Sequence, residues 1–283
     1  MGQASFFRFA MPAQALNLPD MPDLRPPNAW LMLLEGRAPF ELAAAVGTLP
    51  WLRVLRRLPK GDGHPVLVFP GLGANDLTTA PLRLFLNHLG YVTQAWGQGF
   101  NFGPRTGVLA QCKADLLALH KKHGRPVSLI GWSLGGIYAR ELAKELPDLV
   151  RCVVTLGTPF AGPHTSTNAW RIYQFASGRS IERETENYNL PEAPPVPTTS
   201  IYSRSDGVVA WRGSLQASAP HNPHTENIEV VASHFGIGLN PSAWWVVADR
   251  LAQPQVPGAA WQAFKRPALP GLQLVFPDPH RPR

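Results

Sequence analysis

The sequence predicts an α/β fold, with a mostly parallel sheet of about six strands and helices on both faces. Two observations lead to this class. From residue 60 onward, short apolar runs alternate with segments of helical periodicity, and this alternation indicates a parallel sheet covered on both sides. The chain also has 283 residues, 45% of them hydrophobic, which suffices for the core of one large domain.

The chain is predicted to have three parts. Residues 1–60 form an N-terminal extension that becomes helical at about residue 29, residues 61–253 form the main α/β domain, and residues 254–283 form a proline-rich tail. The last helical segment of the extension carries Arg53, Arg56 and Arg57 on one side. Such a basic amphipathic helix is compatible with peripheral membrane contact, although packing on its own domain is the commoner arrangement.

The strands are predicted from strand signals such as short apolar runs closed by turn residues and, at 91–97, an alternating pattern. They are, in chain order, "PVLVFP" (65–70), "YVTQAWG" (91–97), "PVSLIGW" (126–132), "VRCVVTLGTP" (150–159), "TSIYSRSD" (199–206) and "ENIEVVAS" (226–233).

The helices between them are predicted from apolar positions at helical spacing, bounded by glycine or proline. They are "APLRLFLNHLG" (80–90), "GVLAQCKADLLALHKKHG" (107–124), "LGGIYARELAKELP" (134–147) and "PSAWWVVADRLA" (241–252). The alternation breaks over residues 160–198. An insert of this length inside a compact domain is usually functional, so we interpret it as a lid.

Composition excludes several classes of protein. The net charge is +7, but the basic residues are scattered and no nucleic-acid-binding motif accompanies them, so no nucleic-acid partner is expected. Cys112 and Cys152 make neither a disulfide framework nor a metal pair. The sequence contains no apolar run of 18 residues and no signal-like start. We therefore expect a soluble, cytoplasmic protein.

The motif Gly131-Trp132-Ser133-Leu134-Gly135 lies between a predicted strand and a predicted helix. G-x-S-x-G in this context is a nucleophile elbow, in which a strained turn projects the serine hydroxyl above the carboxyl edge of the sheet. Only glycine fits at the positions two residues before and two residues after the serine, because the strand and the helix pass close together there. The alternative is a serine that merely caps the helix.

A nucleophilic serine needs a base that is itself oriented by an acid. Asp206 follows the predicted strand 199–206 and precedes a turn glycine, so we predict it as the acid. Asp148 is the rival, but it precedes a strand and belongs to the opposite edge of a parallel sheet.

His234 lies in the loop after the last predicted strand, so we predict it as the base. His221 and His224 precede that strand and should emerge at the other edge. His164 follows the fourth strand and is the remaining rival.

Acyl transfer also requires donors for the developing oxyanion. The backbone N–H of Leu134 supplies one. The loop "FPGLGAND" (69–76) follows the first strand, and its glycines point to the Leu72 N–H as the second. The alternative for this stretch is an ordinary turn between strand and helix.

Together, "FPGLG", "GWSLGG", "LGTPFAG", "YSRSDGVV" and "SHFGIGLNP" resemble the α/β-hydrolase superfamily, in its bacterial lipase and carboxylesterase branch. The resemblance covers about residues 62–252. It implies an α/β-hydrolase fold and a serine hydrolase of carboxylic esters that needs no cofactor or metal, with Ser133, Asp206 and His234 as its catalytic triad. The sequence departs from many lipases at Pro70, where they have histidine.

The same triad serves acyltransferases and thioesterases, so these remain alternatives, as does a non-catalytic binding module of this fold. The substrate is expected to be a small-molecule or lipid ester. Trp170, Tyr173 and Phe175, in the insert, would line or cover an acyl pocket; alternatively, they pack the insert onto the domain. The oligomeric state is not predicted.

Overall fold

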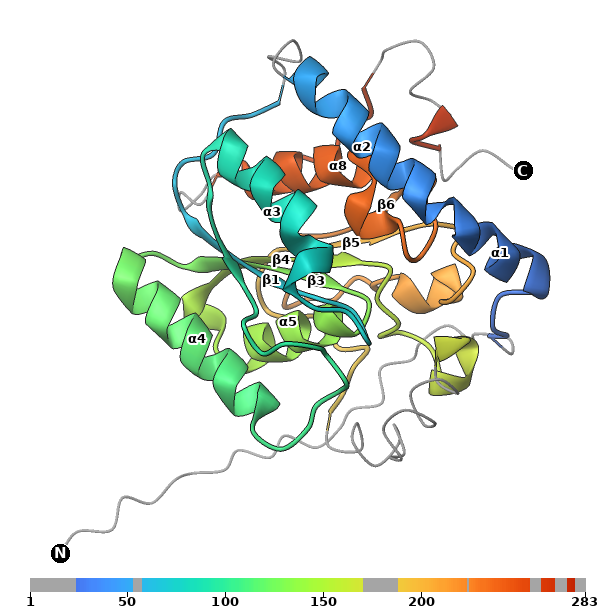
Figure 1. Ribbon diagram of the computed structural model, residues 1–283. Helices are drawn as coiled ribbons and strands as arrows, with labels where there is room; N and C mark the ends of the chain where they lie inside the picture. Colours follow the sequence, from blue (N-terminus) through green and yellow to red (C-terminus); the bar gives the residue numbers. More distant parts are fainter. Residues whose placement is uncertain are drawn as a thin grey trace, which may run out of the picture.

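The computed structural model describes residues 24–52, 58–169, 188–222, 224–254, 261–267 and 274–277. Its centre is a six-stranded sheet of order β2-β1-β3-β4-β5-β6 in which every neighbouring pair is parallel (Figure 1). The strands are β1 (Pro65–Phe69), β2 (Val92–Ala95), β3 (Val127–Trp132), β4 (Val150–Leu156), β5 (Thr198–Tyr202) and β6 (Thr225–Glu229). The predicted class and strand number are confirmed.

Helices cover both faces of this sheet. Helices α3 (Asp76–Leu89) and α8 (Pro241–Leu251) lie on one face, and α4 (Val108–His123) and α5 (Leu134–Glu145) on the other (Figure 1). Phe85 of α3 stacks on Trp244 of α8 at 5.1 Å, and Tyr138 of α5 stacks on Trp96 at 6.2 Å. The central strands β1, β3 and β4 are therefore buried along their whole length, which is why their residues are mostly apolar.

The helix ends follow local signals. Helices α3 and α4 stop at Gly90 and Gly124, whose φ angles of 104° and 61° are left-handed, as glycine permits. Helix α3 begins at Asp76, whereas the sequence predicted a helix that begins at residue 80. Asn75 accepts a hydrogen bond from Leu77 N at 3.0 Å and caps the helix there, so Pro81 lies inside it.

The N-terminal segment consists of α1 (Ala29–Leu33), the 3-10 turn η1 (Leu34–Arg37) and α2 (Ala38–Leu52). Helix α2 packs against α8 and the 3-10 turn η5 (Ile237–Leu239), and Figure 1 shows it above α8. Three further 3-10 turns are η2 (Pro147–Leu149), η3 (His164–Ser166) and η4 (Trp211–Ser214). Arg53, Arg56 and Arg57 lie outside the described residues, so the proposed membrane contact stays a prediction.

Near the C-terminus, Phe264 and Phe276 belong to the same buried cluster as α3 and α8. The division into extension, main domain and tail stays a prediction.

Cys112 and Cys152 are buried and unpaired. Across the described ranges, no helix has both the length and the apolar character needed to cross a membrane.

Candidate active site

Ser133 occupies a sharp turn between β3 and α5. Its backbone angles are φ 51° and ψ −119°, and it is the single residue other than glycine with positive φ in the described part of the chain. Its side chain makes no capping hydrogen bond to α5, which excludes the capping alternative. The hydroxyl is left available for another partner.

The neighbouring glycines provide clearance around this turn. A Cβ atom on Gly131 would collide with the backbone of Gly135 and Gly136, and one on Gly135 would lie 2.5 Å from the carbonyl oxygen of Phe69. Strand β3, helix α5 and strand β1 therefore approach too closely for any side chain at these two positions.

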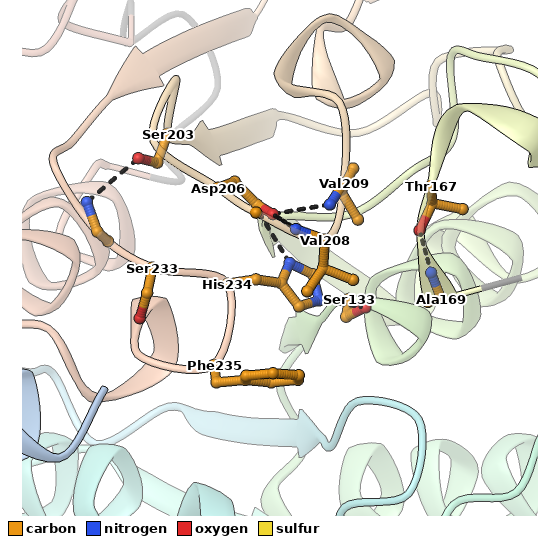
Figure 2. Close-up of polar contacts among 12 residues, drawn as sticks. Ser133, Thr167, Ala169, Ser203, Asp206, Val208, Val209, Ser233, His234 and Phe235 are labelled. Carbon is orange, nitrogen blue, oxygen red and sulfur yellow. Dashed lines mark hydrogen bonds and ion pairs between the residues drawn. The ribbon is translucent and has the colours of Figure 1, made fainter. Parts of the chain in front are cut away.

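Three side chains from separate loops form one hydrogen-bonded chain. His234 Nε2 lies 3.0 Å from Ser133 Oγ, and His234 Nδ1 lies 2.8 Å from Asp206 Oδ2; Figure 2 shows the imidazole between the other two. Because the Asp206 carboxylate accepts a hydrogen bond from Nδ1–H, the proton of the neutral imidazole stays on Nδ1, and Nε2 is free to accept the serine proton. All three residues follow the carboxyl ends of strands, as predicted.

Asp206 is fixed by its own backbone neighbourhood. Its Oδ1 atom accepts hydrogen bonds from Val208 N at 2.8 Å and Val209 N at 2.7 Å (Figure 2). The second oxygen is thereby turned toward His234. This leaves the carboxylate with one orientation, which in turn holds the imidazole in one tautomer and one plane.

The electrostatic surroundings favour a protonated His234. Burial alone would lower the pKa of the imidazolium, but attraction to Asp206, their hydrogen bond and the charge of Glu35 outweigh it, and the pKa is raised above 6.5. An imidazolium formed by taking a proton from Ser133 is stabilised in the same way.

The rival acid and two rival histidines lie elsewhere. Asp148 is in η2, ahead of β4, at the opposite edge of the sheet. His221 Nε2 bonds to the Ala193 carbonyl at 2.8 Å, and His224 stacks on Trp261. The side chain of His164 is not among those described.

The loop after β1 lies beside Ser133. A Cβ atom on Gly71 would be 3.4 Å from Ser133 Cβ, so the loop that continues to Leu72 passes beside the elbow. Leu134 is the first residue of α5, and N–H groups in a first turn have no acceptor within their helix. Leu134 thus directly follows the serine at the start of α5, while the role of Leu72 as a donor stays a prediction.

Asn101 holds this loop, a role that no sequence motif indicates. Its backbone exchanges hydrogen bonds with Gly73 and Ala74 at 2.7 and 2.8 Å, and its Nδ2 donates to the Pro70 carbonyl at 2.8 Å. Its Oδ1 accepts from Tyr138 OH at 3.0 Å. The side chain is fully buried.

A second residue without a sequence signal is Glu35, whose carboxylate bonds to the loops that carry Asp206 and His234.

The predicted substrate-binding residues Trp170, Tyr173 and Phe175 lie outside the described residues. Within the ranges that the structure covers, no group of three or more His, Cys, Asp or Glu side chains is arranged to hold a metal ion.

Comparisons with known proteins point in the same direction. Lipase B of Aspergillus fumigatus matches with a TM-score of 0.54 at 19% identity, covering 68% of this chain and 53% of that one. A pyrethroid hydrolase from Sphingobium faniae matches with a TM-score of 0.50 at 15% identity, covering 68% and 98%. At these identities the similarity concerns the fold.

Among curated proteins, mouse serine hydrolase BPHL is 30% identical over 128 residues, which are 42% of this chain and 43% of the mouse protein. The chain thus spans under half of that relative and about half of lipase B. The model of the alpha/beta hydrolase family matches residues 66–282, well over half of the chain. With the parallel sheet and the serine elbow, this match shows that the chain belongs to the alpha/beta hydrolase family.

Proposed function

We propose that this protein is a serine hydrolase that cleaves carboxylic esters through Ser133, His234 and Asp206. The observation that carries the proposal is the position of the His234 imidazole, 3.0 Å from the serine hydroxyl and 2.8 Å from the carboxylate. This chain of groups can activate a hydroxyl as a nucleophile.

In the first half of the reaction, Ser133 Oγ attacks the ester carbonyl while His234 Nε2 accepts its proton. The resulting imidazolium then protonates the departing alcohol, which leaves an acyl group on the serine. In the second half, His234 takes a proton from water, and the hydroxide attacks the acyl carbonyl. Transfer of the proton back to Ser133 releases the acid.

Both tetrahedral intermediates carry a negative oxygen that needs donors. We assign this role to the backbone N–H groups of Leu134, directly after the serine, and of Leu72, in the loop that passes beside it. A donor of this kind contributes about 3 to 4 kcal/mol to catalysis. The loop with Leu72 is held by Asn101, so this donor is oriented before substrate binds.

The ester class is supported by the names of the related proteins. One is called a serine hydrolase and another a lipase. Both names are compatible with a small-molecule or lipid ester as the substrate. We also propose that the chain belongs to the bacterial lipase and carboxylesterase branch that the sequence predicted.

The test is labelling of the folded protein with a fluorophosphonate probe, which reacts with activated serines. We expect the label on Ser133, with none in Ser133→Ala and a rate lowered by about 10³-fold or more in His234→Ala, because the base is lost. Cys112→Ser, a substitution in helix α4 outside the candidate triad, should label normally. Wild-type protein that stays unlabelled would refute the proposal.

Substrate preference follows from rates on p-nitrophenyl esters of increasing chain length. The same assay with an added alcohol or amine distinguishes hydrolysis from acyl transfer. We expect the free acid as the main product in both conditions, and an acylated acceptor as the main product would establish a transferase.

A further inference from the structure

The carboxylate of Glu35 bonds to both loops that carry the proposed acid and base. Glu35 lies in η1 and is 5% exposed. Its Oε1 accepts hydrogen bonds from Gly207 N at 2.7 Å and His234 N at 2.9 Å, and its Oε2 accepts from Phe235 N at 2.9 Å. Gly207 directly follows Asp206 in the chain. One side chain therefore joins the backbone beside the acid to the backbone of the base.

Neighbouring residues of the N-terminal segment extend this contact. Glu41 Oε1 accepts a hydrogen bond from Ser233 N at 2.7 Å, and Arg37 Nη2 donates to the Ser205 carbonyl at 2.9 Å. Arg37 and Glu41 also pair with each other at 3.1 Å. The residues before Asp206 and before His234 are thus bound to the same segment, so the contact is not confined to one side chain.

The two loops fit the segment closely. A Cβ atom on Gly207 would collide with the carbonyl oxygen of Leu31, and one on Gly236 would collide with the carboxylate of Glu41. Glycine at these positions allows the loop backbone to reach the N-terminal segment. The segment is therefore built into the site and does not simply rest on the outside of the domain.

We propose that Glu35 is a positioning residue that sets the separation and orientation of Asp206 and His234. The proposal rests on the proposed function, because it concerns the same three catalytic residues. The Glu35 carboxylate bonds to backbone N–H groups of the two loops, so it acts through that backbone. A misplacement of about 1 Å at an active site can cost roughly 100-fold in rate.

A carboxylate suits this position better than an amide. Three N–H donors converge on two oxygens, and hydrogen bonds to an ionised acceptor are about twice as strong as neutral ones. A glutamine would turn its NH2 group toward at least one of these donors. The negative charge also acts on His234, together with that of Asp206, while Glu41 is paired with Arg37.

The experiment compares wild type with Glu35→Gln, after circular dichroism shows that both are folded. We expect kcat/KM for a p-nitrophenyl ester to fall roughly 10- to 100-fold, mainly through kcat. We also expect the acid limb of the pH profile to move to lower pH, because one negative charge near the imidazolium is lost. Glu145→Gln, on the exposed end of α5, is the matched control and should behave as wild type.

Loss of stability alone would not move the pH profile of the folded enzyme. If Glu35→Gln does not fold, Glu35→Asp keeps the charge but withdraws both oxygens by one methylene, and it should show reduced kcat with the acid limb in place. A folded Glu35 variant with wild-type kcat and pH profile would overturn the inference. Wild-type protein that fluorophosphonate does not label would instead overturn the proposed function.

Discussion

At the scale of single residues, His234 determines how the proposed activity depends on pH. The base must be neutral to accept the Ser133 proton, and its pKa is raised because Asp206 and Glu35 outweigh the effect of burial. We expect kcat/KM to rise with pH through an acid limb whose pKa lies above 6.5, the ordinary histidine value.

Initial rates on a p-nitrophenyl ester, corrected for its own hydrolysis and taken from about pH 5 to 9, measure this limb. Asp206→Asn should lower the rate at every pH, because the imidazole then takes the wrong tautomer. An acid limb below 6.5 would contradict the electrostatic arrangement described for His234.

At the scale of elements, the loop after β1 depends on a residue from the loop after β2. Asn101 donates its amide to the Pro70 carbonyl at 2.8 Å and accepts from Tyr138 OH of α5. Asn101→Asp keeps the shape but places an oxygen against that carbonyl. The loop should then withdraw Leu72, and kcat should fall roughly 10- to 100-fold with little change in KM.

Steady-state kinetics of the folded variant test this role. Gln111→Glu makes a similar amide-to-acid change on the exposed face of α4 and should leave kcat unchanged. If Asn101→Asp turned over at the wild-type rate, Leu72 would not depend on Asn101 for its position.

At the scale of the whole molecule, a second chain of Asp, His and Ser ties the amino edge of the sheet together. His64 Nδ1 lies 2.5 Å from Asp62 Oδ1, and its Nε2 lies 2.8 Å from Ser128 Oγ. Ser128 is fully buried in β3, where no substrate can reach it. The same three residue types that form the candidate triad thus have a structural role at the amino edge of the sheet.

This second histidine predicts the acid sensitivity of the fold. Burial, opposed in part by Asp62, lowers the pKa of His64 from 6.5 to about 4, so the unfolded chain binds the proton more readily than the folded one. The free energy of unfolding should therefore fall by up to about 3 kcal/mol as pH drops from 6.5 to 4. Guanidinium unfolding curves at several pH values measure this slope. His64→Gln should flatten it, and equal slopes in both proteins would exclude His64 as its source.

Much of this architecture could be predicted because it depends on local patterns. Buried strands need apolar runs, helices end at glycines such as Gly90, and a serine elbow needs glycines on both sides. Asp206 and His234 could be chosen over their rivals because parallel strands direct all their carboxyl ends to one edge. The predicted start of α3 at residue 80 was wrong. Asn75 caps the helix five residues earlier in the chain, so the helix begins at Asp76 and Pro81 lies inside it.

The sequence by itself therefore determined the sheet, the elbow and the edge at which the candidate triad lies. Only the tertiary structure decided which residues hold that triad in place. Glu35 lies 199 residues from His234 in the chain and 172 from Gly207, and its partners are backbone N–H groups. A backbone N–H is present at every residue except proline, so such a contact leaves no pattern in the sequence.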